Sequence, residues 1–483
     1  MFEQIPILHE DMGPRDGSGW RPCLTSKRAA AIGVGILFVS VIVLAVVLSE
    51  RTRSVDATVF LPPSLVRKPE LMGLHYCGLN PAKPSTYPGV PQLLDDQDFE
   101  LVLVQAFIRH GDRFFDTGDK CWPGQENISY SCSLTHLSMP GINESLVSMP
   151  APGQIYRVQY MKNRNDFEGN CRVGQLTLKG HDMEFTLGTI FKSAYVGRLL
   201  NPDLNLDEVY FRSDDVPRTV LSAESVISGM FPENGRAPGS TRIVPIWSMD
   251  FDRETEISNA HCCPGLLQQF QQAQASRPYQ EHLRTVSAPL REKLSRVFGV
   301  PISQVSDNAF DCLMVSLCRG ELVPELVDAD LVKELEAEAR YRFYYPIQFP
   351  DRVNGGKLAF GPLLREILAR MERAVKGVST SDPKFTLYSG HDTGPIMLLL
   401  SAFGVDTIDP YWAPYSSYIS LELYRSKSSI GPQHLVRMVY NGKALPLPLT
   451  SLNGNAVSYD DLAAMVQPMI PSHDECPDPY FHT

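Results

Sequence analysis

The segment Arg109-His110-Gly111-Asp112-Arg113 contains the residue types of a phosphoryl-transfer site. An imidazole nitrogen is a nucleophile that can carry a phosphoryl group. Guanidinium groups present a rigid fork of donors that matches the oxygens of a phosphate. The glycine beside the histidine allows a ligand to approach the backbone closely. These residues predict a site at which His110 faces a phosphate that is bound by Arg109 and Arg113.

The elements around this segment are those of an α/β protein. The apolar run Leu101–Ile108 precedes the motif and predicts a buried strand. Two more runs, Val209–Phe211 and Lys384–Gly390, predict strands that end at polar residues, and each precedes a helical pattern. Because α/β folds bind ligands outside the carboxyl ends of their strands, we expect the three strand ends to converge.

Three segments in this order resemble the histidine acid phosphatases. The first motif resembles their Arg-His-Gly-x-Arg signature, and residues 212–219 resemble their Arg-Ser-x-Asp-x-x-Arg-Thr segment. A His-Asp pair, His391-Asp392, follows the third predicted strand, as the family requires. Residues 174–180 resemble a shorter Gly-x-Leu-Thr-x-x-Gly segment, and the resemblance covers about residues 99 to 445.

The resemblance implies phosphomonoester hydrolysis through a phosphohistidine. His110 is then the nucleophile, and Asp392 donates a proton to the leaving oxygen. The phosphate-binding residues that it implies are Arg109, Arg113, Arg212 and His391. Since Asp392 must be protonated for the first step, we expect an acidic to mildly acidic pH optimum. Arg218 lies inside a predicted helix, and we interpret it as a packing or ion-pair residue.

No cofactor or metal ion is expected. His110, Asp112, His391 and Asp392 offer metal-ligating atoms, but the family motifs explain them without a metal, and Asp112 is interpreted as structural. The cysteines lack the paired spacing of a zinc site.

The composition is that of a globular protein with an ample core. The chain has 483 residues, of which 43% are hydrophobic and 20% charged, with a formal net charge of −11. This charge argues against a nucleic-acid partner, because no basic domain is visible. A phosphate site must then be a local basic pocket in an acidic protein.

We expect a three-layer α/β core, similar to phosphoglycerate mutase, with a mixed central sheet and a mainly helical cap. The core is assigned to residues 99–249 and 384–483, and the cap to residues 250–383. Helical periodicity in the cap covers Tyr279–Val297, Ala329–Arg342 and Leu358–Val375. Further strands are expected at Arg242–Trp247, and as an edge hairpin at Tyr418–Tyr424 and His434–Tyr440.

The N-terminal part predicts a membrane anchor. Residues 29–49 are uncharged and long enough to span a bilayer once, and Lys27-Arg28 precede them. We interpret residues 1–28 as a cytoplasmic tail and residues 29–49 as an uncleaved type II signal-anchor, although a cleaved signal peptide is the alternative. The proline-rich residues 50–98 are predicted to be a luminal stem.

Cysteines and sequons fit a luminal body. Nine cysteines follow the predicted anchor, so disulfides are expected with one thiol left over, and the pairing stays open. We expect Cys262, Cys263, Cys312 and Cys318 to crosslink the cap. Two glycosylation sequons begin at Asn127 and Asn143, in a predicted surface insertion.

The predicted anchor and luminal body favour a location in the Golgi membrane. We expect the protein to be a glycoprotein that acts in proteoglycan biosynthesis. Within the family, Val104–Arg113, Tyr345–Ala374 and Leu387–Val405 are most similar to members that remove phosphate from xylose in the glycosaminoglycan–protein linkage region. The predicted substrate is therefore a phosphorylated glycan. Alternatives are a general or lysosomal acid phosphatase, a lysophosphatidic acid phosphatase, and an inactive scaffold that binds a linkage-region glycosyltransferase.

Overall fold

The computed structural model describes residues 61–83, 87–94, 97–118, 120–130, 132, 137–138, 156–157, 167–232, 243–377, 382–452 and 455–477. From residue 62 onward the chain forms one compact unit. The predicted tail and anchor, and the sequon at Asn143, lie outside the described residues. Among the helices that are described, none is both long and apolar enough to cross a bilayer.

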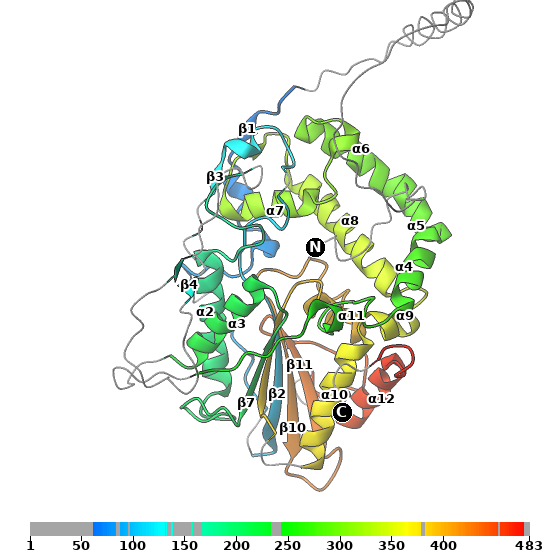
Figure 1. Cartoon of the computed structure of the whole chain (residues 1–483). Helices are drawn as coiled ribbons and strands as arrows, with labels where there is room; N and C mark the ends of the chain where they lie inside the picture. The colour runs from blue at the N-terminus through cyan, green and yellow to red at the C-terminus, as the bar shows by residue number, and fades with distance from the viewer. Residues whose placement is uncertain are drawn as a thin grey trace, which may run out of the picture. The chain divides into compact units, whose positions relative to one another are not determined.

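A mixed sheet forms the centre of this unit (Figure 1). Its strands lie in the order β12-β11-β10-β2-β9-β7, with β13 (Val457–Ser458) paired to β11. The bounds are β12 Lys443–Ala444, β11 His434–Tyr440, β10 Tyr418–Ser426, β2 Phe99–Arg109, β9 Phe385–Gly390 and β7 Val209–Ser213. Strands β2, β9 and β7 are parallel, and β10 and β11 are antiparallel to their neighbours. The predicted mixed sheet and its hairpin are confirmed.

The strand predicted at Arg242–Trp247 is wrong for the described residues 243–247. Trp247 makes only an isolated bridge with Arg212 on β7, with Trp247 N donating to Phe211 O at 2.9 Å. Pro245 lacks an N–H, so this segment cannot continue a hydrogen-bonded ladder along the edge of the sheet.

Helices α2 (Leu178–Tyr195) and α3 (Pro217–Met230) cover one face of the sheet. Every second residue of β2 points to this face, which is the period of a strand. A single apolar cluster is formed by the buried residues Val104, Ala106, Ile108, Leu187, Phe191, Phe211, Val226, Met230, Phe385 and Leu387, among others.

Helix α10 (Gly361–Lys376) covers the opposite face. Gln105 of β2 donates to the carbonyl of Ile367 at 3.1 Å, and Phe107 stacks on Tyr388 with ring centroids 4.6 Å apart. The core therefore has the predicted three layers. Because α10 contacts the sheet directly, it forms one helical layer of the core. The prediction that all of residues 250–383 belong to the cap is therefore wrong for α10.

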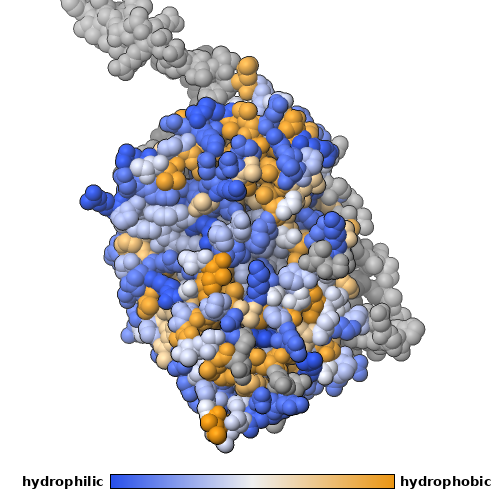
Figure 2. All heavy atoms as spheres, turned by 180° about the vertical axis from the view of Figure 1, so that it is seen from behind, coloured by the Kyte–Doolittle hydropathy of each residue, from blue (hydrophilic) through white to orange (hydrophobic). Residues whose placement is uncertain are grey.

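The remaining helices of the insertion lie beyond one end of the sheet (Figure 1). They are α4 Gly265–Ala275, α5 Arg277–His282, a π-helical turn at Leu283–Ser287, α6 Ala288–Phe298, α7 Ala309–Arg319 and α8 Ala329–Ile347. The short helix α9 (Arg352–Ala359) connects them to α10 and contacts α11 (Ile396–Ala402), which follows β9. Helix α12 (Tyr459–Val466) packs beside β11. Figure 2 shows polar and charged side chains over the rear face, with apolar ones scattered among them.

The prediction of a stem as far as residue 98 is wrong for the described residues 62–83 and 87–94. Strand β1 (Leu65–Val66) pairs with β8 (Val323–Pro324) of the insertion, and Tyr76 is buried. Cys77 forms a disulfide with Cys318 at the end of α7. The prolines exclude long helices here, but they do not prevent an irregular segment from packing on the body.

Four disulfides connect segments far apart in the sequence: Cys77–Cys318, Cys121–Cys312, Cys132–Cys171 and Cys263–Cys476. Cys262 is buried and is the one unpaired cysteine among the described residues, so the expected leftover thiol is confirmed. The cap cysteines do not pair with one another. Instead, Cys318, Cys312 and Cys263 join the cap to the N-terminal segment, to the loop after Arg113 and to the C-terminal segment, respectively.

Removing the Cys77–Cys318 bridge should destabilise the protein. The bridge closes a span of 241 residues, and a disulfide that closes so long a loop typically contributes about 2–5 kcal/mol to the free energy of unfolding. The double variant Cys77→Ser/Cys318→Ser should lower this free energy by that amount in urea unfolding. Cys262→Ser is the matched control, and an equal loss in both variants would contradict the prediction.

Candidate active site

The register of the parallel strands brings the two histidines together. Arg109, the last residue of β2, lies opposite Gly390, the last residue of β9, and His110 N donates to Gly390 O at 3.0 Å. The rings of His110 and His391 are therefore neighbours, with centroids 5.5 Å apart. Gly111 is required because a Cβ there would lie 2.3 Å from the carbonyl oxygen of Gly180 in α2.

The His110 ring is prepared to act through one nitrogen. Its Nδ1 lies 2.8 Å from the carbonyl oxygen of Gly111, so Nδ1 carries the proton and donates it. Its buried Nε2 has no hydrogen-bond partner among the described residues. Burial, followed by the positive charges of Arg218, Arg109 and Arg113, lowers the pKa of His110 well below its ordinary value. The imidazole is thus neutral, with a free lone pair on Nε2.

Arg109 connects the histidine loop to Asp392. Its Nη2 lies 2.9 Å from Asp392 Oδ2 and donates to Tyr76 Oη at 2.8 Å, and its Nη1 donates to the carbonyl of Ala413. The guanidinium also lies over the rings of Tyr76 and Tyr415, at 4.6 and 4.3 Å from their centroids. Tyr76, from the segment predicted to be a stem, therefore forms part of the site.

Arg113 faces the cap. Its Nη2 donates to Asp311 Oδ1 at 2.8 Å, and its Nη1 donates to Asp311 Oδ2 at 3.3 Å and to the carbonyl of Phe114. Asp311 belongs to the first turn of α7.

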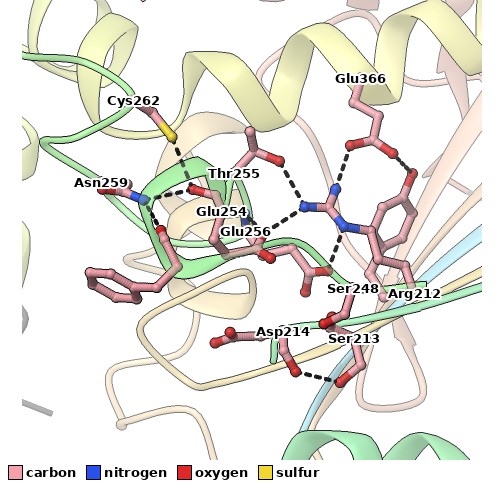
Figure 3. A network of polar contacts seen from close by, with 12 residues as sticks. Arg212, Ser213, Asp214, Ser248, Glu254, Thr255, Glu256, Asn259, Cys262 and Glu366 are labelled. Carbon is pink, nitrogen blue, oxygen red and sulfur yellow. Dashed lines mark hydrogen bonds and ion pairs between the residues drawn. The ribbon is translucent and has the colours of Figure 1, made fainter. Parts of the chain in front are cut away.

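Arg212 does not lie in this pocket, so the prediction that it binds phosphate is wrong. Its guanidinium is surrounded by buried carboxylates, with 2.6 Å to Glu254 Oε1, 2.6 Å to Glu366 Oε2 and 3.4 Å to Glu256 Oε1 (Figure 3). The physical reason is register. Arg212 lies opposite Tyr388 on β9, two residues before the level of Gly390, and points toward α10.

Arg218 occupies the pocket instead. Its Nη2 lies 3.4 Å from His391 Nδ1 and 3.3 Å from Asp116 Oδ1, and its positive charge lowers the pKa of His110 more than the charge of Arg109 or Arg113 does. Pro217 fixes the first helical position of α3, which places Arg218 in the turn that begins at the end of β7. The predicted ion pair of Arg218 is confirmed by its contact with Asp116, but the prediction did not place Arg218 in the pocket. The helix-initiating proline was the signal that could have located it.

His391 and Asp392 are both held by hydrogen bonds. His391 Nε2 donates to Asp214 Oδ2 at 2.7 Å. Asp392 accepts from the indole N–H of Trp412 at 2.5 Å and from Thr393 N at 2.9 Å. Burial favours the neutral carboxyl, but Arg109 and the Trp412 hydrogen bond outweigh it and lower the pKa of Asp392. Asp392 is therefore ionised beside Arg109.

Asp112 lies behind the pocket. It accepts from Thr177 Oγ1 at 2.6 Å, and Thr177 is the N-cap of α2. Lys179 Nζ lies 3.3 Å from its other oxygen. These contacts anchor the histidine loop to α2. Over the described residues, no group of three His, Cys, Asp or Glu side chains could hold a metal ion.

Sequence comparison shows the family. The family model for the histidine phosphatase superfamily (branch 2) matches residues 100–441. The chain is 28% identical to counting factor 60 of Dictyostelium discoideum, over 73% of this chain and 83% of that protein. It is 26% identical to the lysosomal acid phosphatase of Xenopus laevis (63% and 71%) and 25% identical to human lysophosphatidic acid phosphatase type 6 (72% and 79%).

Solved structures show the same fold at low identity. The Hafnia alvei phytase in complex with myo-inositol hexakis sulphate matches with a TM-score of 0.51 and 14% identity, over 78% of this chain and 99% of that one. The Bifidobacterium longum multiple inositol polyphosphate phosphatase, in complex with inositol hexasulfate, matches with a TM-score of 0.51 and 12% identity, over 83% and 98%.

Proposed function

Because the chain belongs to the histidine phosphatase superfamily (branch 2) and is a phosphatase of the histidine acid phosphatase type, we propose that His110 is its nucleophile. The observation that carries this assignment is the free lone pair of His110 Nε2 among Arg109, Arg113 and Arg218. A neutral imidazole surrounded by guanidinium groups can attack phosphorus while the positive charges bind the phosphate oxygens.

The reaction has two displacements. In the first, His110 Nε2 forms a bond to phosphorus, the bond from phosphorus to the ester oxygen breaks, and Asp392 gives its proton to the departing alcohol. In the second, water attacks phosphorus, the phosphorus–nitrogen bond breaks, and the Asp392 carboxylate takes a proton from the water. Phosphate leaves, and His110 and Asp392 return to their starting states.

Four groups bind the phosphate in this proposal. Arg109, Arg113 and Arg218 donate hydrogen bonds to its non-bridging oxygens, and His391, oriented by Asp214, lies beside them. A guanidinium that donates to a phosphoryl group strengthens its hydrogen bonds as charge grows in the transition state. Arg218 thereby takes the phosphate-binding role that was predicted for Arg212.

Asp392 must gain a proton before it can donate one. Arg109 keeps the pKa of Asp392 low, so the carboxylate is charged at neutral pH. A bound phosphate brings negative charge next to Asp392, and a like charge raises the pKa of a carboxyl group. The protonated form then becomes more populated as the pH falls, which favours an acidic optimum.

The lowered pKa of His110 predicts that activity survives at acidic pH. The neutral nucleophile persists below the ordinary value of 6.5, so the acid limb of kcat/KM should lie well below that pH. The variant Arg218→Gln removes a positive charge, which raises the pKa of His110 and should move the acid limb to higher pH. Rates measured from about pH 3 to 8 test this, and a limb that stays in place would contradict it.

The proposed substrate is the 2-O-phosphate of xylose in the glycosaminoglycan–protein linkage region of proteoglycans. This rests on the resemblance of Val104–Arg113, Tyr345–Ala374 and Leu387–Val405 to the 2-phosphoxylose phosphatases. A type II anchor in the Golgi membrane belongs to the same proposal, with glycosylation at the exposed Asn127 and at Asn143. The four disulfides support the proposal that the part of the chain after the anchor lies in an oxidising compartment.

Two alternatives follow from the relatives and one from another class of protein. The chain could act as a general or lysosomal acid phosphatase, or on lysophosphatidate, since relatives with these names match it. It could also be an inactive scaffold for a linkage-region glycosyltransferase. The complete set of His110, Asp392 and three arginines argues against the scaffold.

One assay separates these functions. The purified protein would be offered a phosphoxylosyl linkage glycopeptide, lysophosphatidate and p-nitrophenyl phosphate. The proposal expects kcat/KM to be highest for the glycopeptide. A preference for lysophosphatidate, or equal rates on all three, would overturn the xylose assignment but not the chemistry. Absence of turnover on all three would favour the scaffold.

A further inference from the structure

An acidic side chain from the cap reaches the candidate active site. The carboxylate of Asp311 accepts from both terminal nitrogens of Arg113, at 2.8 and 3.3 Å. Its Oδ2 also accepts from the backbone N–H of Asp116 at 3.0 Å. Arg113 therefore meets a carboxylate on the side that faces the cap.

Two disulfides fix the position of Asp311. The next residue, Cys312, is joined to Cys121 in the segment that follows Arg113. At the other end of α7, Cys318 is joined to Cys77, which follows Tyr76 of the site. Both disulfides link α7 to segments beside the pocket, so they hold Asp311 next to Arg113.

A second carboxylate lies beside the first. Asp116 Oδ1 is 3.3 Å from Arg218 Nη2. Arg113 thus contacts the carboxylate of Asp311, and Arg218 contacts that of Asp116. We call Asp116 and Asp311 the acidic pair. Their side chains are 10% and 15% exposed, whereas Asp214 and Asp392 are buried deeper. Arg113 and Arg218 are therefore each paired with a carboxylate at the outer side of the pocket.

We propose that Asp311, together with Asp116, selects singly phosphorylated, hydroxyl-rich substrates and rejects polyphosphorylated ones. A carboxylate offers only acceptors, so it binds the hydroxyl groups of a sugar through charge-assisted hydrogen bonds. A second phosphate next to the scissile one carries nearly two negative charges, and it would be repelled by the acidic pair. This inference rests on the proposed function and specifies the substrate class of the same site.

The variant Asp311→Asn tests the proposal because it keeps the shape of the side chain and removes its charge. kcat/KM would be measured on xylose 2-phosphate, on myo-inositol hexakisphosphate and on p-nitrophenyl phosphate, which has one phosphate and no hydroxyl. Relative to p-nitrophenyl phosphate, the value for xylose 2-phosphate should fall about three- to tenfold. The value for the hexakisphosphate should rise about tenfold or more.

Asp307→Asn is the matched control. Asp307 precedes α7 and pairs with Arg291 at the surface, at 2.8 Å, so both ratios should equal those of the wild type. If Asp311→Asn slowed all three substrates by the same factor, its role would be structural and the proposal overturned. Ratios within about twofold of wild type would overturn it as well. Failure of the proposed chemistry is distinguishable, because His110→Ala would then retain wild-type turnover.

Discussion

The variant His110→Ala is expected to lose at least about 10⁴-fold in kcat, because it removes the atom that forms the covalent intermediate. Arg109, Arg113 and Arg218 remain in place, so binding of inorganic phosphate should persist. The loss should therefore appear in kcat more than in the inhibition constant for phosphate. Steady-state assays with p-nitrophenyl phosphate at acidic pH measure both quantities.

The control for this variant is His181→Ala. His181 lies on the outer side of α2, where it contacts Asp182 at the surface. Its loss should leave kcat within about twofold of wild type. Equal activity of the His110 and His181 variants would show that another group attacks phosphorus.

Arg218 and Arg212 should fail in different ways when they are replaced. Arg218→Met removes a group that faces the phosphate, so kcat/KM should fall by about 10²–10³ with little change in thermal stability. Arg212→Met leaves Glu254, Glu256 and Glu366 without their shared positive charge in a buried cluster. Loss of one partner from a buried ion pair typically costs about 3–5 kcal/mol of unfolding free energy.

Activity per folded molecule and urea unfolding together separate the two roles. Arg212→Met should keep most of its specific activity at low temperature but unfold at a lower urea concentration. Arg291→Met, which removes a surface ion pair with Asp307, should change neither quantity. If Arg212→Met lost activity while it kept its stability, the assignment of Arg218 to the phosphate would be contradicted.

The sequence predicted the parts of the site that adjoin their strands. Arg109 and His110 come at the end of a long apolar run, so the end of that strand could be inferred from hydrophobicity. His391 and Asp392 follow the shorter, mixed segment 384–390, and the family's His-Asp pair located them. The apolar run before Arg212 has only three residues, and polar residues follow it. The last residue of this strand could therefore not be predicted from hydrophobicity. The structure continues β7 to Ser213, which places Asp214, not Arg212, beside His391.

Contacts made across long stretches of chain could not be predicted. Asp311 and Trp412 reach the site from a cap helix and from the loop before β10, and neither carries a local motif. The pairing of Cys77 with Cys318 is one of many that nine cysteines allow. Proline content indicated an extended segment before residue 99, but it could not show that Tyr76 packs against Arg109.

The most direct measurement is rapid acid-quench trapping of labelled phosphate on the protein. Wild-type enzyme mixed with a labelled phosphomonoester should retain label that is stable in alkali, is lost in acid on longer incubation, and maps to the peptide that contains His110. The variant His110→Ala should retain none. Label that persists in His110→Ala, or its absence from wild-type enzyme that is turning over, would contradict a phosphohistidine at this position.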